Sequence, residues 1–302
     1  MVLLLNSSVA KEYKGVKIFI DEDMNYEINN FLKRFVNLLL VPVLNHLPKK
    51  FQRFVKKTHK SAEEVIEYAT THKAIEILYK KGATHASRNR AQKFMQEFWF
   101  HTNNAKAVRN RLKLVEKVLR RTITSLTALQ KRINILSIAS GSARAVIETL
   151  SSLNISNKKI SVKFLDKSTE AIAYSKELAN KLPRRYETEW ITDTASNFPR
   201  YYRHEKPDII EMVGLMDYFH DPWVIRILAS IRENLSDKGT LITANIMPNM
   251  EQGFVSNIVG WKMIYRTPED LADLALAAGF DRDKVRIVCE PLKIHAVLIA
   301  KK

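Results

Sequence analysis

The chain has 302 residues and a single cysteine, Cys289, which excludes an internal disulfide, a multi-cysteine zinc cluster and an iron–sulfur site. Its content of 46% hydrophobic and 27% charged residues is ordinary for a folded protein, and its length suits one large domain or two unequal ones. The net charge of +17 is uneven, because residues 1–130 hold 24 Lys and Arg against 11 Asp and Glu, whereas residues 131–302 hold 25 against 21. The basic N-terminal part therefore predicts an anionic partner: nucleic acid, anionic lipid or an acidic carrier protein.

The N-terminal segment predicts no export signal and no membrane span. It lacks a basic start before its short apolar run, and the longest apolar stretch, residues 35–47, is shorter than the ~20 residues of a spanning helix. We therefore expect a cytoplasmic protein. Residues 16–20 predict a short strand or the edge of an extended arm, and residues 26–47 predict one or two apolar helices broken near Pro42.

A basic amphipathic segment, PKKFQRFVKKTHK, covers residues 48–60, and no acidic residue lies between Asn29 and Ser61. Three interpretations are open: a solvated face of a helical bundle, an interfacial helix on an anionic membrane, and a contact surface for nucleic acid. Phenylalanines interleaved with lysines favour the membrane surface slightly.

Helical periodicity dominates the next stretch of the chain. Residues 61–82 predict one helix that begins with a capping box of Ser61 and Glu64 and ends at Gly82. Residues 88–126 predict two further helices with a break near Thr102.

From Lys131 onward, apolar strand patterns alternate with helical ones. Such repeated β-α units predict an α/β fold with a mostly parallel sheet and helices on both faces. We thus expect a basic, mainly helical N-terminal domain, residues 1–124, and an α/β domain, residues 125–302. The expected strands are residues 135–139, 160–166, 188–193, 208–214, 240–247, 285–291 and 295–302, and the expected helices are residues 144–152, 222–234, 268–278 and one that starts at Ser168.

Ligands of open α/β sheets bind beyond the carboxyl ends of the strands, and four segments fall there. The first is the small-residue turn of residues 139–143, where a ligand can approach the backbone closely. Asp166 ends the next strand, where a carboxylate can accept both hydroxyls of a ribose. Asp193 is placed to reach an adenine edge, and residues 211–214 would face the reacting group.

These segments resemble the motifs of class I S-adenosylmethionine-dependent methyltransferases. LSIASGSAR resembles the glycine-rich first motif, KFLDKS the second, ITDTA the adenine-positioning segment and DIIEMVGLMDYF the fourth motif, and the last two strands resemble the family's antiparallel closing hairpin. The resemblance covers residues 125–302 and implies a Rossmann-like seven-stranded sheet with an antiparallel C-terminal strand. It also implies S-adenosyl-L-methionine as cofactor, bound by Ser137, Ala139, Ser140, Gly141, Asp166, Lys167, Asp193, Thr194, Glu211 and Val213.

Two departures from the family pattern lie in the first motif. An acid is usual two residues before the first glycine, and here that position is Ser137, so a partner for the methionine end of the cofactor is missing. Ala139 and Ala143 replace two glycines, which still permits close packing while φ stays negative. A degenerate cofactor-binding module is therefore one alternative.

The acceptor is predicted largely by exclusion. The fourth motif is not Asn/Asp-Pro-Pro-aromatic, so methylation of an amino group on adenine or cytosine has no support, and Cys289 lies in a strand pattern rather than on a site loop. No histidine or carboxylate cluster has metal-ligand spacing. We predict transfer to an oxygen of a small apolar or lipid-like acceptor by positioning and in-line displacement. The alternative is an RNA-directed methyltransferase that binds RNA phosphates with the basic N-terminal domain.

Candidate residues for the acceptor site follow the fourth motif and the fifth strand. Asp217, Tyr218 and His220 are the catalytic candidates, and Asp217 or His220 could act as a base toward a hydroxyl. Arg266 could hold an anionic group, and Arg109 or Arg111 could meet the cofactor's carboxylate. An apolar wall could be formed by Met247, Met250, Phe254, Trp261, Met263 and Tyr265.

Overall fold

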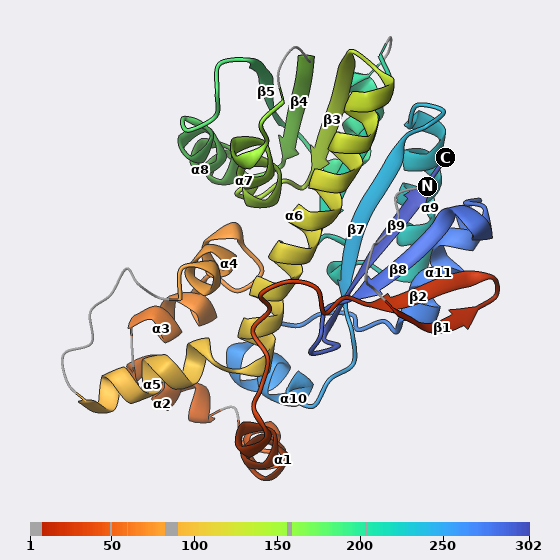
Figure 1. Cartoon of the computed structure of the whole chain (residues 1–302). Coiled ribbons are helices and arrows are strands. Elements are labelled where there is room, and N and C mark those ends of the chain that lie inside the picture. The colour runs from red at the N-terminus through yellow and green to blue at the C-terminus, as the bar shows by residue number, and fades with distance from the viewer. Residues whose placement is uncertain (1–7, 49, 59, 82–89, 156–158, 203–204) are drawn as a thin grey trace.

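The computed structural model describes residues 8–48, 50–58, 60–81, 90–155, 159–202 and 205–302 (Figure 1). Its centre is a twisted sheet of nine strands in the order β1-β2-β8-β9-β7-β6-β3-β4-β5. The strands are β1 (Ser8–Tyr13), β2 (Val16–Ile20), β3 (Arg132–Ile138), β4 (Lys159–Asp166), β5 (Tyr186–Thr192), β6 (Ile209–Val213), β7 (Thr240–Ile246), β8 (Val285–Cys289) and β9 (His295–Lys301).

The predicted count of seven strands is wrong, because an N-terminal hairpin extends the sheet. β2 pairs in parallel with β8, and β1 pairs antiparallel with β2. Lys14 and Gly15 both have positive φ, 49° and 82°, as a tight two-residue hairpin turn requires. Val16 and Ile18 are buried, so the hairpin shares the core of the sheet.

The rest of the sheet has the predicted arrangement. β3 to β7 run parallel, and β9 runs antiparallel between β7 and β8, which confirms the closing hairpin. Helices cover both faces, which is why β7 is buried along its whole length. One face packs on α9 (Asp221–Asn234) and α11 (Pro268–Ala277), the other on α6 (Asn103–Leu129), α7 (Arg144–Ser152) and α8 (Thr169–Ala179).

A helical lobe lies beyond the carboxyl edge of the parallel strands (Figure 1). Pro42 lies within its first helix, so the predicted break there is wrong. The structure also divides the predicted helix of residues 61–82, because Thr70 has a φ of 75° and Ser61 lies inside α3 rather than at its cap; Gly82 is outside the described residues. The lobe contains α1 (Phe31–Asn45), α2 (Lys50–Thr58), α3 (Lys60–Glu67), α4 (His72–Tyr79), α5 (Arg90–Phe100) and the short α10 (Gln252–Phe254).

The helix α6 joins the lobe to the sheet. Its start confirms the break predicted near Thr102, whose hydroxyl accepts the Ala105 N–H and caps the helix. Since α6 continues to Leu129, it runs through the predicted domain boundary at residue 124, and that division stays a prediction. Among the described residues, no helix has the combination of length and hydrophobicity that a transmembrane span needs.

Candidate active site

The turn after β3 has an unusual backbone. Ala139, Gly141 and Ala143 have φ angles of 51°, 53° and 54°, so the expectation that the alanines keep negative φ is wrong. The left-handed conformation costs an alanine roughly 1–2 kcal/mol. Hydrogen bonds offset this strain: Ser140 donates its N–H to Leu165 O at 3.0 Å, and Ala143 donates to Ser140 O at 2.6 Å.

Asp166 ties this turn to the end of β4. Its carboxylate accepts the N–H of Gly141 at 2.8 Å and, through the other oxygen, the N–H of Ser168 at 2.8 Å. Ser168 in turn caps α8 by accepting the Ala171 N–H. The first and second motifs therefore form one hydrogen-bonded unit at the carboxyl edge of the sheet.

Asp193, at the end of β5, organises its own loop. Its carboxylate accepts the Thr194 N–H, the Asn197 amide and the Tyr201 hydroxyl, at 2.7, 2.8 and 2.7 Å. The Tyr201 hydroxyl is the main cause that lowers the pKa of Asp193. In this structure, then, the carboxylate closes the loop that follows β5.

Ser137 and Glu211 face each other across two parallel strands. They are register partners in β3 and β6, and the Ser137 hydroxyl donates to Glu211 Oε2. Both side chains are buried, and burial raises the pKa of Glu211 to about 7, although the hydrogen bond from Ser137 lowers it. An acid missing from the first motif is thus present one strand away.

The predicted cofactor segments line a single cavity of about 730 Å³, a volume within the ~300–1,000 Å³ of cofactor and small-molecule sites. Ser137 is not a lining residue, but its hydroxyl is hydrogen-bonded to Glu211, which is one. The predicted cofactor residues that line the cavity are Ala139, Ser140, Gly141, Asp166, Lys167, Asp193, Thr194, Glu211 and Val213.

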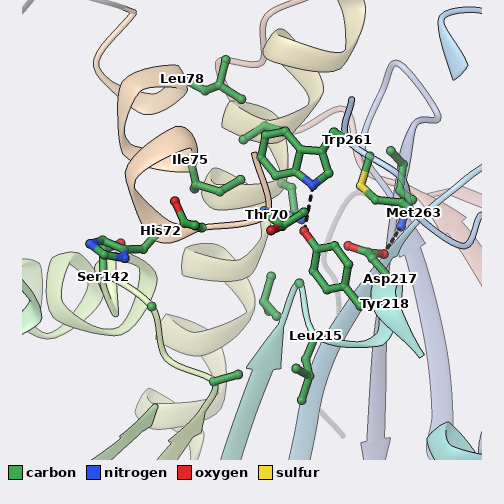
Figure 2. Close-up of a pocket in the computed structure, with 18 of the residues that line it drawn as sticks. Thr70, His72, Ile75, Leu78, Ser142, Leu215, Asp217, Tyr218, Trp261 and Met263 are labelled. Atoms are coloured by element: carbon green, nitrogen blue, oxygen red, sulfur yellow. Dashed lines mark hydrogen bonds between the residues drawn. The ribbon is translucent and has the colours of Figure 1, made fainter. Parts of the chain in front are cut away.

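The other half of the cavity is apolar and is closed by the helical lobe. Ile75 and Leu78 of α4 face the segment after β7 across the cavity (Figure 2). Of the predicted apolar wall, Met247, Met250 and Tyr265 are not lining residues. The residues that line this half include Val65, Ile75, Leu78, Trp99, Phe254, Val255, Val259, Trp261 and Met263.

The three catalytic candidates have different positions. Asp217 lines the cavity, is buried, and accepts the Ile246 N–H at 2.8 Å, and burial raises its pKa. Tyr218 lines the cavity, and its hydroxyl accepts a hydrogen bond from Trp261 Nε1 at 2.8 Å (Figure 2). Burial raises the pKa of Tyr218 to about 12. His220 is exposed before α9 and is not a lining residue.

Of the three arginines predicted to bind an anionic group or the cofactor's carboxylate, one lines the cavity and two do not. Arg266 donates hydrogen bonds to Asp221, Asn245 and backbone carbonyls, and it is not a lining residue of the cavity. Arg109 binds Glu27 and backbone carbonyls. Arg111, by contrast, lines the cavity and is buried, and its Nε has no hydrogen-bond partner among the described residues.

His295 is the site residue that the sequence did not reveal. It begins β9 opposite Ile246, lines the cavity and is 2% exposed. Neither ring nitrogen has a partner within the described part of the chain. Burial, with the nearby Arg111 guanidinium, lowers its pKa well below the usual value, so the imidazole is neutral. A histidine in a closing strand gives no motif, and only the fold brings it to the end of β7.

A buried ion pair joins the lobe to the cofactor turn. Arg144, which begins α7 directly after the turn, donates from Nε to Glu76 of α4 at 2.9 Å, and Tyr174 donates to the same carboxylate at 2.8 Å. Arg144 and its neighbours keep the pKa of Glu76 below its ordinary value against the effect of burial. The position of α4 over the cavity is therefore coupled to the turn.

Comparison with known proteins agrees with this geometry. A search of curated protein sequences finds no match. A possible exported protein from Bordetella parapertussis has a similar structure, with a TM-score of 0.61 and 16% identity over 78% of this chain and 80% of that one. The CurJ carbon methyltransferase has a TM-score of 0.52 and 12% identity, over 91% of this chain and 72% of that one. Magnesium protoporphyrin IX methyltransferase from Synechocystis PCC 6803 with bound SAM has a TM-score of 0.50 and 11% identity, over 80% and 97%.

At these identities the solved structures show a shared fold, and the family comes from the sequence. The model of a family described as "Putative methyltransferase" matches residues 68–302, which is most of the chain. The chain therefore belongs to this methyltransferase family, as its motifs predict.

Proposed function

We propose that the protein transfers a methyl group from S-adenosylmethionine to an oxygen of a small apolar or lipid-like acceptor. The carrying observation is that the cofactor motifs and a closed apolar compartment share one cavity. The structural relative from Synechocystis, crystallised with SAM, supports the choice of cofactor.

The residues of the turn fit this cofactor. The buried Ser140 hydroxyl lines the cavity and has no partner among the described residues, so it is available to a ligand. A Cβ added at Gly141 would meet only His72 Cβ, at 3.6 Å, within the surroundings described, so the backbone is open on that side. Asp166 would hold the ribose, and Glu211 would take the place of the missing acid toward the methionine ammonium.

The acceptor half supports an apolar substrate. Trp99, Phe254 and Trp261 bury a large nonpolar surface there, and Arg111, Asp217 and His295 are among the polar residues that line the same cavity. Such a compartment binds a molecule with a nonpolar body and one polar end. We propose that the helical part of residues 1–124, from α1 onward, forms the cap over this half, whereas β1 and β2 extend the sheet.

When bound, the cofactor supplies an electrophilic methyl group on a sulfonium, and the chain's contribution is positioning and proton transfer. His295 has an open nitrogen in the cavity and, being neutral, can accept the proton of an acceptor hydroxyl. Asp217 lines the same cavity and is a second proton acceptor there. Aromatic side chains exclude water from the reacting atoms.

The proposal is tested first by cofactor binding and then by label transfer. S-adenosylhomocysteine should bind in calorimetry, and Asp166→Ala should weaken its binding at least tenfold. Labelled S-adenosylmethionine incubated with fractionated extract should place label in the lipid or small-molecule fraction. Label in RNA would refute the acceptor class. Binding of S-adenosylhomocysteine without label transfer in any fraction would favour the degenerate cofactor-binding module, and absence of cofactor binding would refute the proposed function.

His295 gives a sharper test once an alcohol acceptor is found. His295→Asn should lower kcat by a factor of ~100 or more while the affinity for S-adenosylhomocysteine stays within twofold. His220→Asn is the matched control, because His220 is exposed and outside the cavity, and it should leave kcat unchanged. Equal losses in both variants would contradict the assignment.

A further inference from the structure

The first helix of the lobe exposes a continuous apolar stripe. Phe31, Phe35, Leu38, Leu39 and Val43 are all exposed, Phe31 by 85% and Leu39 by 61%. Residues 31, 35, 39 and 43 recur every four residues and Leu38 lies three residues after Phe35, which places all five on one side of α1. We call these five residues the α1 stripe. A contiguous apolar surface of this kind marks an interaction site rather than ordinary solvent exposure.

Other side chains of α1 attach the helix to the cavity wall. Val41 is buried, and Asn45 donates to Met250 O at 2.6 Å and accepts the Phe254 N–H at 2.7 Å. Phe254 lines the acceptor half of the cavity. The α1 stripe therefore belongs to a helix that is fixed to the wall of the active site.

The helix α2, together with the first residue of α3, supplies positive charge without negative charge. Lys50, Arg53 and Lys57 of α2 and Lys60 of α3 are exposed, and no acidic residue lies between Asn29 and Ser61. In Figure 1, α1 and α2 lie in the part of the lobe farthest from the sheet. α2 also contacts the π-helical turn η3 (Val255–Val259), which lines the cavity.

We propose that the α1 stripe and the cations of α2 dock on an anionic lipid bilayer, with α1 lying in the interface. The combination matches what an interfacial helix needs, which is an apolar face for the acyl boundary and cations for the headgroups. RNA would engage the cations but would leave five large apolar side chains in water, so the charge and the apolar surface together favour lipid.

Docking in this way would serve the acceptor site. A lipid-like molecule could pass from the bilayer to the apolar half of the cavity along α1, α10 and η3, without crossing water. This consequence rests on the proposed function, whereas the docking itself does not.

Co-sedimentation of the full chain with vesicles tests the docking. Binding should be strong with phosphatidylcholine vesicles that contain phosphatidylglycerol, weak with phosphatidylcholine alone, and reduced by salt. Arg53→Ala/Lys57→Ala should weaken binding by roughly fivefold for each cation removed. Phe31→Ser/Leu39→Ser should weaken it more than tenfold, including at low salt.

Matched variants control for exposure and charge elsewhere. Val9→Ser/Leu129→Ser removes two exposed apolar side chains, and Lys181→Ala/Lys238→Ala removes two exposed cations, all outside α1 and α2. Both controls should bind vesicles like the wild type. An equal loss of vesicle binding in the control variants would overturn the docking surface. So would tight binding of an RNA oligonucleotide by a chain that does not bind vesicles. Calorimetry with S-adenosylhomocysteine on the same samples separates this result from a failure of the proposed function.

Discussion

The buried pair of Ser137 and Glu211 makes the pH dependence of cofactor binding predictable. Glu211 has a pKa of about 7 because burial disfavours its carboxylate, and a cofactor ammonium beside it needs the ionised form. Below pH 7, the affinity for S-adenosylhomocysteine should therefore fall about tenfold for each pH unit, equal to ~1.4 kcal/mol, and it should level off above pH 7.

Two substitutions separate Glu211 from other sources of this pH dependence. Glu211→Gln should abolish the dependence and bind weakly at every pH. Ser137→Ala removes the hydroxyl that lowers the pKa of Glu211, so the midpoint should move to higher pH by about one unit, since a hydrogen bond to a charged group contributes ~1.5–3 kcal/mol. His72 also lines the cavity and has a lowered pKa, so His72→Gln is the control that should keep the midpoint near 7.

The assay is isothermal titration calorimetry with S-adenosylhomocysteine between pH 5 and pH 7.5, a range in which an α-amino group stays mostly protonated. A midpoint above this range is recognised because the affinity of Ser137→Ala still rises about tenfold per pH unit at pH 7, where that of the wild type begins to level off. An affinity that is flat over this range in the wild type would refute the role of Glu211. A midpoint that moves with His72→Gln but not with Ser137→Ala would assign the titration to the histidine instead.

Two further substitutions test the turn and its link to the lobe. Ala139→Gly should raise the free energy of unfolding by up to ~1 kcal/mol in urea denaturation, because relief of left-handed strain of roughly 1–2 kcal/mol exceeds the ~0.4–1 kcal/mol that glycine adds to unfolded-state entropy. Ala145→Gly, inside α7, should lower the free energy of unfolding by ~1 kcal/mol. A change of the same sign in both variants would contradict the left-handed strain at Ala139. Glu76→Gln breaks the buried pair with Arg144 and should cost about 3 kcal/mol at pH 7, against less than ~1 kcal/mol for Glu170→Gln in its exposed pair with Lys73. Because the folded pKa of Glu76 is lowered, this stabilisation is present above its ordinary value of 4.5 and is lost as the pH falls through the lower folded value, so the two proteins should converge in acid denaturation.

The sheet could be predicted because its strands carry their own signal. Parallel strands covered on both faces are continuous apolar runs, and the helices between them have clear starts, such as Ser168 before α8. β1 gave no such signal, because Ser8–Tyr13 is a polar edge strand whose register depends on β2. The break at Thr70 was hidden for a related reason: the apolar stripe continues across it, and tertiary packing decides where the backbone bends.

The same distinction between local sequence signal and tertiary packing decides which site residues could be predicted. Residues at strand ends, such as Asp166 and Glu211, could be found, because the carboxyl ends of parallel strands meet at one edge. Arg111 could be predicted only as an alternative to Arg109, because both lie in one long basic helix, and His295 could not be singled out, because it begins an apolar strand. Their relevance comes from buried nitrogens that have no hydrogen-bond partner among the described residues, Nε of Arg111 and both ring nitrogens of His295, and burial is a property of the folded chain.

The two departures in the first motif differ in kind. Alanine at residues 139 and 143 leaves the turn in the left-handed conformation that glycine would adopt, so the cost is one of stability and the backbone remains open to a ligand. Serine at residue 137 removes a charge, which no backbone adjustment can restore. Register partners in adjacent parallel strands point to the same face of a sheet, so a carboxylate at residue 211 can serve the position that residue 137 vacates. Its burial, however, raises its pKa toward neutrality. A chain built this way would bind its cofactor in a pH-dependent manner, whether it is an enzyme or a cofactor-binding module.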